Sequence, residues 1–311
     1  MLAVRRGNPM RIRTEDAGTV MRLAFALLIA SLAHQAHAEV RVTDDAGHNV
    51  VLAAPAKRVI SLGPHLTELA YAAGGGAAMV GVIRFSDYPA AARQLAVVGD
   101  AHAIDFERIV QLKPDLVLVW GSGLNERHKA RLRSLGLTVF ESEIRSVQGI
   151  PDTLRRLGTL LGHADAAEAS ARRFETQWQA LAERHRGPAS VRPVRVFWQL
   201  WHEPLMTINR EHLISEAMRA CGGVNVLADL PLLTPSVSWE AAIAADPQLI
   251  AGSGRKGDAE RDFAAWKKLG QNVSAVKRQR FASIDGDLIG RMGPRFVEGA
   301  AGLCEAIERA R

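Results

Sequence analysis

The sequence contains few residues of several kinds, and this limits what the protein can be. Among 311 residues there are two cysteines and two tyrosines, aromatic residues make up 5%, and the formal net charge is +6. Segment 1–38 holds five arginines against two acidic residues, so the rest of the chain is only weakly basic. No run of Lys and Arg with interleaved aromatics occurs, which argues against a nucleic-acid partner.

Catalytic signatures are also missing. The chain has no G-x-S-x-G, no G-x-x-x-x-G-K-[ST] and no H-E-x-x-H, and its ten histidines lack metal-ligand spacing, so we expect no enzyme and no metal site. Gly252, Gly254 and Gly257 do follow an apolar run in G-x-G-x-x-G spacing. A dinucleotide site needs an acidic residue about 20 positions later, and none lies near position 272, so an NAD-dependent enzyme is only an alternative.

The N-terminal region has the pattern of a secretory signal. Met21–Val40 contains one arginine, an uncharged apolar run from Leu23 to Leu32 and an A-x-A ending at Ala38. The run is shorter than the roughly 18 residues that a membrane span needs. We predict a signal peptide over 1–38, cleaved after Ala38, with Met21 a better start than Met1, and therefore a periplasmic protein. A presequence or a short buried helix is the alternative.

Apolar runs alternate with helical patterns along the remaining chain. This alternation is typical of an α/β fold with mainly parallel sheets, and it occurs in two blocks, over 39–148 and 189–311. Between them, 149–188 is a linking helical segment whose long helix is predicted at about 164–186. One face of that helix carries Ala167, Ala171, Phe174, Trp178 and Leu181. The fold predicted is two Rossmann-like lobes joined by a single long α-helix.

A weak repeat relates the two blocks. Residues 105–123 and 238–254 each place a glutamate, Glu107 or Glu240, seven residues before a proline, then an apolar strand and Gly-Ser-Gly. We interpret Gly-Ser-Gly as a turn after the strand in both lobes. Asp105 and Ser238 are expected to cap helices, and a glutamate in the first turn complements the helix dipole.

The two cysteines, Cys221 and Cys304, have two interpretations. In a reducing compartment they would be small buried thiols, whereas in an exported chain an even number points to one disulfide.

Several stretches resemble a known family. RVISLGPHLTELAYAAG, RFSDYP, FERIVQLKPDLVLVW, ACGGVNVLAD and RMGPRF, with LC near the end, are similar to the helical-backbone (class III) periplasmic binding proteins that serve ABC importers of cobalamin, haem and ferric siderophores, the cobalamin-binding members above all. The resemblance covers 56–307. It implies a monomeric, non-enzymatic protein without a cofactor, which carries a corrinoid to an ABC permease with its ATPase. Haem, a ferric siderophore and, less favoured, zinc are alternative ligands.

The resemblance also implies roles for individual residues. The pair Cys221 and Cys304 matches the family's disulfide, and Glu107 and Glu240 match the two acidic residues that dock on permease arginines. The ligand-binding positions that match are Pro64, His65, Phe85, Gln199, Trp201, Thr234, Asp287 and Arg291.

The chain departs from the cobalamin-binding members at three ligand positions. Phe85 replaces a tyrosine, and Ala101 and Thr234 each replace a tryptophan, so two large aromatic walls are missing. Substitutes for these walls could come from the tryptophans at positions 120, 198, 201 and 239. Asp287 and Arg291 are four residues apart, which suits either hydrogen bonds to corrin amides or an ion pair on a helix turn.

Overall fold

The computed structural model describes residues 39–311 except 101, 188–189 and 255–262. The predicted signal peptide, Ala101 and Gly257 therefore lie outside the described residues. Val40–Arg311 forms one compact unit. The division into separate domains, with boundaries at 148 and 188, remains a prediction. No described helix carries an apolar run long enough to cross a bilayer.

The N-terminal lobe is built on a five-stranded parallel sheet with strand order β5-β4-β3-β6-β7. Its strands are β3 (Val59–Leu62), β4 (Met79–Val82), β5 (Ala96–Val97), β6 (Leu116–Trp120) and β7 (Val139–Ser142). These strands are short apolar runs because a parallel sheet is covered by helices on both faces, so that residues on both sides of each strand are buried. Helix α2 (Pro64–Ala72) covers one face, whereas α3 (Phe106–Gln111) and α4 (Glu126–Ser134) cover the other. An antiparallel hairpin, β1 (Val40–Thr43) with β2 (Asn49–Leu52), and two 3-10 turns, Gly75–Ala78 and Ala90–Gln94, complete the lobe.

The C-terminal lobe repeats the plan with a four-stranded parallel sheet of order β11-β8-β12-β13. Its strands are β8 (Val194–Gln199), β11 (Gly223–Asn225), β12 (Leu249–Gly254) and β13 (Phe281–Asp285). One face packs on α7 (Leu213–Ala220) and α13 (Phe296–Arg309), and the other on α8 (Trp239–Ala244), α10 (Ala264–Leu269) and α11 (Ser274–Lys277). The short α12 (Gly286–Ile289) follows β13, and β9 (Trp201–His202) pairs with β10 (Leu205–Met206) in a small hairpin. The apolar run 194–201 is divided between β8 and this hairpin, because Trp201 begins β9.

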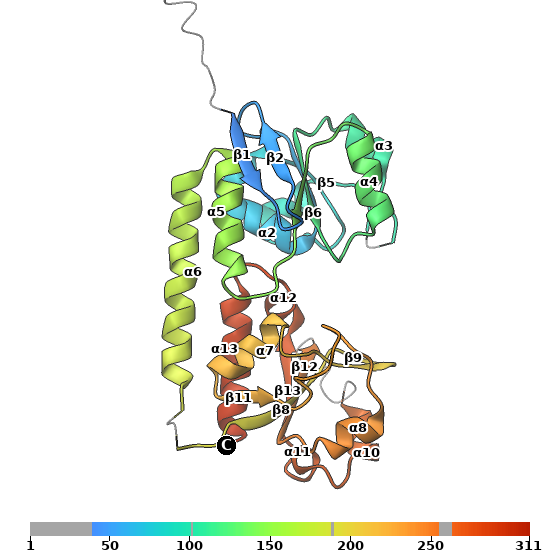
Figure 1. The fold of residues 1–311 in the computed structure, drawn as a ribbon, viewed down its shortest axis with the longest axis vertical. Helices are drawn as coiled ribbons and strands as arrows, with labels where there is room; N and C mark the ends of the chain where they lie inside the picture. The colour runs from blue at the N-terminus through green and yellow to red at the C-terminus, as the bar shows by residue number, and fades with distance from the viewer. Residues whose placement is uncertain (1–38, 101, 188–189, 255–262) are drawn as a thin grey trace, which may run out of the picture. The chain divides into compact units, whose positions relative to one another are not determined.

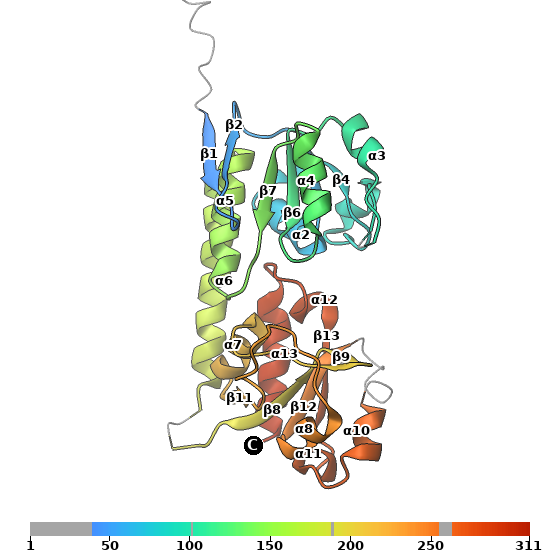
Figure 2. The same cartoon turned by 45° about the vertical axis from the view of Figure 1, so that its right-hand side comes forward.

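Two helices, rather than one, make up the linking segment. Helix α5 (Gly149–Leu161) runs beside α6 (Ala164–His185), as Figures 1 and 2 both show. Helix α6 confirms the predicted long helix to within a residue. Its buried Ala167, Ala171, Phe174 and Leu181 join one continuous core that includes residues of both lobes. A helix packed along its length against both lobes resists bending between them.

The sequence repeat is also a structural repeat. Asp105 caps α3 by accepting a hydrogen bond from the backbone N of Arg108 (2.8 Å), and Ser238 caps α8 in the same way toward Ala241 (3.2 Å). In both copies the residue before the proline, Lys113 or Asp246, has a positive φ. One expectation is wrong: the second Gly-Ser-Gly, 252–254, stays in strand β12 because it pairs with β13 through Gly254.

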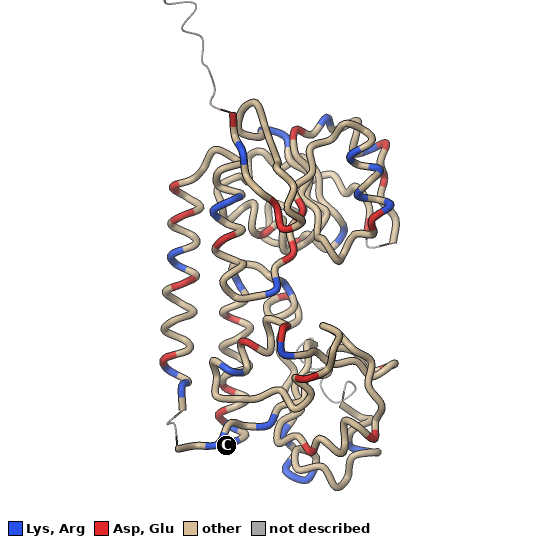
Figure 3. The backbone as a smooth tube through the Cα atoms, in the orientation of Figure 1, with Lys and Arg blue, Asp and Glu red and all other residues tan. Residues whose placement is uncertain are grey.

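Positions of both charge signs are interspersed along the described backbone (Figure 3), in keeping with the weak net charge of the chain after position 38.

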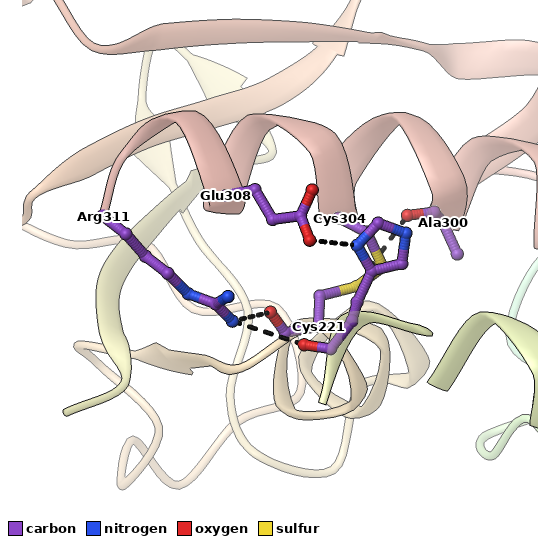
Figure 4. The surroundings of a disulfide bond; sticks show 6 residues. Cys221, Ala300, Cys304, Glu308 and Arg311 are labelled. Carbon is purple, nitrogen blue, oxygen red and sulfur yellow. Dashed lines mark hydrogen bonds and ion pairs between the residues drawn. A yellow bond between two sulfur atoms is a disulfide. The ribbon is translucent and has the colours of Figure 1, made fainter. Parts of the chain in front are cut away.

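The disulfide between Cys221 and Cys304 is present and joins the end of α7 to α13 (Figure 4). Both cysteines are fully buried. Beside them, Nδ1 of His185 lies 2.8 Å from Oε1 of Glu308, and the Arg311 guanidinium donates to the carbonyl oxygens of His185 and Cys221. This cluster fixes the end of α6 to the C-terminal lobe.

Candidate ligand-binding site

Both lobes contribute to one cavity of ≈510 Å3. Its walls come from loops that follow β6, β7 and β8, from β12, and from the segments around α7 and α12. The lining residues are Trp120, Ser122, Glu143, Ile144, Arg145, Leu200, His212, Leu213, Ile214, Leu233, Thr234, Ser253, Gly290 and Met292. Ligands of open α/β sheets bind at the carboxyl ends of the strands, and the volume lies within the usual range of about 300–1,000 Å3.

A few polar groups are placed among the apolar side chains of this cavity. The Glu143 carboxylate accepts a hydrogen bond from the backbone N of Ser122 (2.7 Å) and lies 3.5 Å from Nε of Arg145. Nδ1 of His212 accepts a hydrogen bond from the backbone N of Ile214 (3.2 Å), so the proton of the neutral ring is on Nε2. Burial lowers the pKa of His212 to about 4, and the ring is therefore uncharged at neutral pH.

At the wall of the cavity, two aromatic rings meet edge to face. The centroids of His65 and Trp120 are 5.3 Å apart, and His65 is 3% exposed. Burial, with a smaller contribution from the positive charge of Arg291, lowers the pKa of His65 to about 3. Nε2 of His65 and Nε1 of Trp120 have no hydrogen-bond partner within the described part of the chain. Buried ring nitrogens of this kind are uncommon and mark places where a ligand can supply the partner.

A cluster of charged side chains joins the two lobes next to these rings. Glu68 on α2 is almost fully buried, and its carboxylate accepts hydrogen bonds from Nη1 of Arg291 (2.9 Å) and from Nε and Nη2 of Arg295 (2.9 and 2.6 Å). Arg291 also donates to Asp87 and Asp287, each at 2.8 Å. Although burial opposes it, these hydrogen bonds raise the pKa of Arg291. We call these five residues the inter-lobe cluster.

The structure brings several predicted ligand residues together. Arg291 donates to Asp287, its partner within the inter-lobe cluster, and to the backbone oxygen of Phe85 (3.3 Å), so Phe85 lies beside the cluster, with His65 close by. Phe85 is 70% exposed and has a left-handed φ of 68°, a strained conformation that occurs preferentially at ligand sites. Pro64 begins α2 beside His65. The ligand roles of these residues stay predictions.

The other predicted ligand residues are dispersed. Of the eight, only Thr234 lines the cavity. Gln199 is buried and its Oε1 accepts a hydrogen bond from Nε1 of Trp266 (2.9 Å), which ties it to the core of the C-terminal lobe. Trp201 is 55% exposed on the β9–β10 hairpin, with its ring against His202.

Only one of the four candidate tryptophans lines the cavity. Trp120 does so, whereas Trp198 is fully buried and Trp239 packs edge to face on Trp266, 5.2 Å away. Trp198 thus has the alternative role of a core tryptophan, and Trp239 packs against the core of the C-terminal lobe, away from this cavity. Sequence reasoning missed Glu143 and Arg145, although their place just after a buried strand could have indicated them.

The two glutamates predicted to dock on a permease occupy equivalent positions. Glu107 and Glu240 are both exposed in the first turn of a helix, α3 and α8 respectively, and neither forms an ion pair among the described residues. Backbone and Ser238 hydrogen bonds lower the pKa of Glu240. Both side chains are thus available to a partner. The described residues contain no group of three or more His, Cys, Asp or Glu able to hold a metal ion.

Two α/β lobes with facing strand ends, a shared cavity and a long connecting helix define a class of two-lobed ligand-binding proteins. Residues 59–288 match the family described as periplasmic binding protein, and the chain belongs to that family. It is 34% identical over 257 residues to a vitamin B12-binding protein of Vibrio cholerae, with 83% of this chain and 91% of that protein covered. A vitamin B12-binding protein of Yersinia pestis is 36% identical over 250 residues, with 80% and 86% covered.

Solved structures agree with this assignment. The periplasmic vitamin B12-binding protein BtuF of Vibrio cholerae superposes with a TM-score of 0.73 at 34% identity, covering 82% of this chain and 98% of that one. The periplasmic haem-binding protein BhuT, solved with two haems, has a TM-score of 0.71 at 25% identity, with 82% and 98% covered. The predicted α/β fold and the predicted family are thereby confirmed.

Proposed function

We propose that this protein is the substrate-binding protein of an ABC importer and holds a corrinoid between its two lobes. The observation that carries the proposal is the cavity walled by both lobes at the strand ends, in a chain 34–36% identical to vitamin B12-binding proteins. The cavity combines apolar walls with a few fixed polar groups, and this combination suits an uncharged ligand rich in amides. The protein binds and releases its ligand without chemistry and needs no cofactor of its own.

The corrinoid would extend beyond the cavity. A macrocycle with its nucleotide tail is larger than ≈510 Å3, so the cavity would take only one side of it. Exposed aromatic rings at the carboxyl ends of strands β4 and β8, from Phe85 and Trp201, would provide further apolar contact. The rigid α6 implies that the lobes move little when the ligand enters.

Haem is the second candidate, and His65 is the observation that favours it. The ring is neutral at pH 7, because its pKa is lowered to about 3, and its Nε2 has no hydrogen-bond partner among the described residues. An axial ligand of haem has both properties. The ring is buried behind Trp120, however, so it would have to rotate to reach iron. A corrinoid needs no such movement.

Absorption spectroscopy separates these ligands. The purified chain beginning at Glu39 is mixed in turn with cyanocobalamin, haemin and NADH, and unbound ligand is removed by gel filtration. We expect the corrinoid spectrum to remain with the protein in equimolar amount. Retention of haemin with a shifted Soret band, lost in His65→Gln but kept in His128→Gln as a matched control, would instead establish the haem function.

We infer further that Glu107 and Glu240 dock the protein on basic residues of the permease. Replacing both by Ala should slow corrinoid uptake and leave corrinoid affinity and melting temperature nearly unchanged, since rim charges act on orientation and association rate. If these glutamates only complement helix dipoles, each replacement costs about 0.3–1 kcal/mol of stability and uptake stays at the wild-type rate. Export to the periplasm after cleavage at Ala38, and action as a monomer, complete the proposal.

A further inference from the structure

Two polar side chains of the cavity, Glu143 and His212, lie outside the predicted set of ligand residues. Glu143 follows β7 in the N-terminal lobe, and His212 precedes α7 in the C-terminal lobe, and both line the cavity. The segments that carry them are joined, because the carboxylate of Glu216 on α7 accepts a hydrogen bond from the backbone N of Val147 (2.9 Å). The two side chains therefore border the same space from the two lobes.

Glu143 is held in place but keeps an acceptor for a ligand. Its backbone N donates to the carboxylate of Asp45 (2.7 Å), and its Oε2 accepts from the backbone N of Ser122 (2.7 Å). Among the described residues, Oε1 pairs with Nε of Arg145 at 3.5 Å, which is too long for a strong hydrogen bond. The side chain of Arg145 is 61% exposed, so this ion pair is weak, and Oε1 remains able to accept from a ligand.

His212 provides a neutral hydrogen-bond donor. Its Nδ1 accepts from the backbone N of Ile214, which leaves the proton of the ring on Nε2. Because burial lowers the pKa of His212 to about 4, the ring donates from Nε2 at pH 7 without carrying a positive charge. No described residue accepts a hydrogen bond from Nε2. This donor is therefore available to a ligand.

An anionic acceptor and a neutral donor on one cavity match a primary carboxamide. The NH2 group of an amide donates to a carboxylate, and its carbonyl oxygen accepts from an imidazole N–H. A ligand carboxylate in the same place has no proton to donate and carries the same charge as Glu143. Because the Glu143 side chain is only 18% exposed, water screens this repulsion poorly. The cavity can thus distinguish an amide from the corresponding acid.

We propose that Glu143 and His212 recognise one propionamide side chain of the corrin and exclude the corresponding propionate. This inference rests on the proposed function and specifies the chemical group that enters the cavity. The macrocycle is too large for the cavity, whereas a flexible propionamide reaches from the ring edge between apolar walls such as Leu213 and Leu233. Haem carries propionates at its edge, so the same arrangement disfavours haem.

The test compares cyanocobalamin with its singly deamidated isomers, each of which has a different propionamide converted to propionate. Isothermal titration at pH 7 gives the dissociation constants for the wild type, Glu143→Gln, Arg145→Gln and a control, Glu183→Gln. The control removes an exposed carboxylate from α6, away from the cavity lining. Glu143→Gln keeps an oxygen that accepts from Ser122 and introduces an NH2 group that can donate to a carboxylate.

We expect one isomer to bind the wild type and the control at least about tenfold more weakly than cyanocobalamin. In Glu143→Gln this penalty should shrink to about threefold or less, whereas in Arg145→Gln it should persist. Equal binding of all isomers and cyanocobalamin to the wild type, or a penalty that Glu143→Gln leaves unchanged, would overturn the inference. An isomer that binds more tightly than cyanocobalamin and loses this advantage in Arg145→Gln would also overturn it, because Arg145 would then recognise a carboxylate.

A separate variant tests the donor. His212→Asn keeps a side-chain oxygen that can cap α7 but removes the N–H on Nε2. We expect it to bind cyanocobalamin about 3- to 10-fold more weakly, with the penalty against the propionate isomer retained. Wild-type affinity of His212→Asn would remove His212 from the inference. Failure of the wild type to bind cyanocobalamin at all would overturn the proposed function itself, whereas every other adverse result leaves that function standing.

Discussion

Glu68 provides the most direct test of the inter-lobe cluster. Its side chain is 1% exposed and accepts hydrogen bonds from two arginines whose side chains are 12% and 18% exposed. Removing one member of a buried ion pair typically costs about 3–5 kcal/mol, because the partner charge stays buried without compensation. Glu68→Gln keeps the shape and one acceptor but removes the charge.

The surroundings reduce the expected cost. Arg291 keeps Asp87 and Asp287, each at 2.8 Å, and Arg295 still lies over the ring of Tyr88 at 3.9 Å. Of the two arginines, only Arg295 is left without a carboxylate partner among the described residues, so we expect Glu68→Gln to lower the free energy of unfolding by about 2–3 kcal/mol. Glu305→Gln is the matched control: its pair with Arg309 spans 3.7 Å and is well exposed, so it should contribute less than about 0.5 kcal/mol.

Urea unfolding at pH 7, followed by tryptophan fluorescence, measures both variants, and an unchanged m-value shows that the same transition is compared. If Glu68→Gln unfolds at the same urea concentration as Glu305→Gln, the carboxylate is hydrated in solution and the inter-lobe cluster does not stabilise the protein.

Three further predictions follow from individual side chains. The pKa of His65 is lowered from 6.5 to about 3, so the unfolded chain takes up the proton first, and the free energy of unfolding should fall by about 1.4 kcal/mol per pH unit below pH 6.5. His65→Gln should make urea midpoints at pH 7 and pH 5 more similar, and an unchanged pH slope would contradict the burial of this ring. Reduction or joint Cys221→Ala and Cys304→Ala replacement opens a loop with a sequence separation of 83 and should cost roughly 4–5 kcal/mol by loop entropy, whereas full labelling of both thiols without reductant would show no bond. Trp120→Leu should weaken ligand binding about tenfold by calorimetry, since it removes an aromatic wall of the cavity; equal affinity would place the ligand elsewhere.

The sequence was most informative where a pattern repeats over several turns or strands. The long helix was predicted from its apolar face, and the burial of that face against both lobes explains why it is apolar. The two helix caps and the glutamates in the first turns after them were found because the same local pattern occurs twice in the sequence. Both features are determined by residues that lie close together in the sequence.

Features that depend on distant neighbours were not predictable. The inter-lobe cluster joins Glu68 to Arg291 across more than two hundred residues, and no spacing rule indicates such a pair. A tryptophan such as Trp198 or Trp239 looks the same in a sequence whether it faces a ligand or the core. The second Gly-Ser-Gly was interpreted as a turn because pairing with β13, formed thirty residues later, was not visible in the local pattern.

Isothermal titration of the chain beginning at Glu39 with cyanocobalamin tests the central claim most directly. The account predicts saturable binding of one corrinoid per protein, with an affinity that Trp120→Leu lowers and Glu183→Gln does not. Absence of heat with cyanocobalamin over the titration, together with tight binding of haemin or Zn2+ under the same conditions, would contradict it.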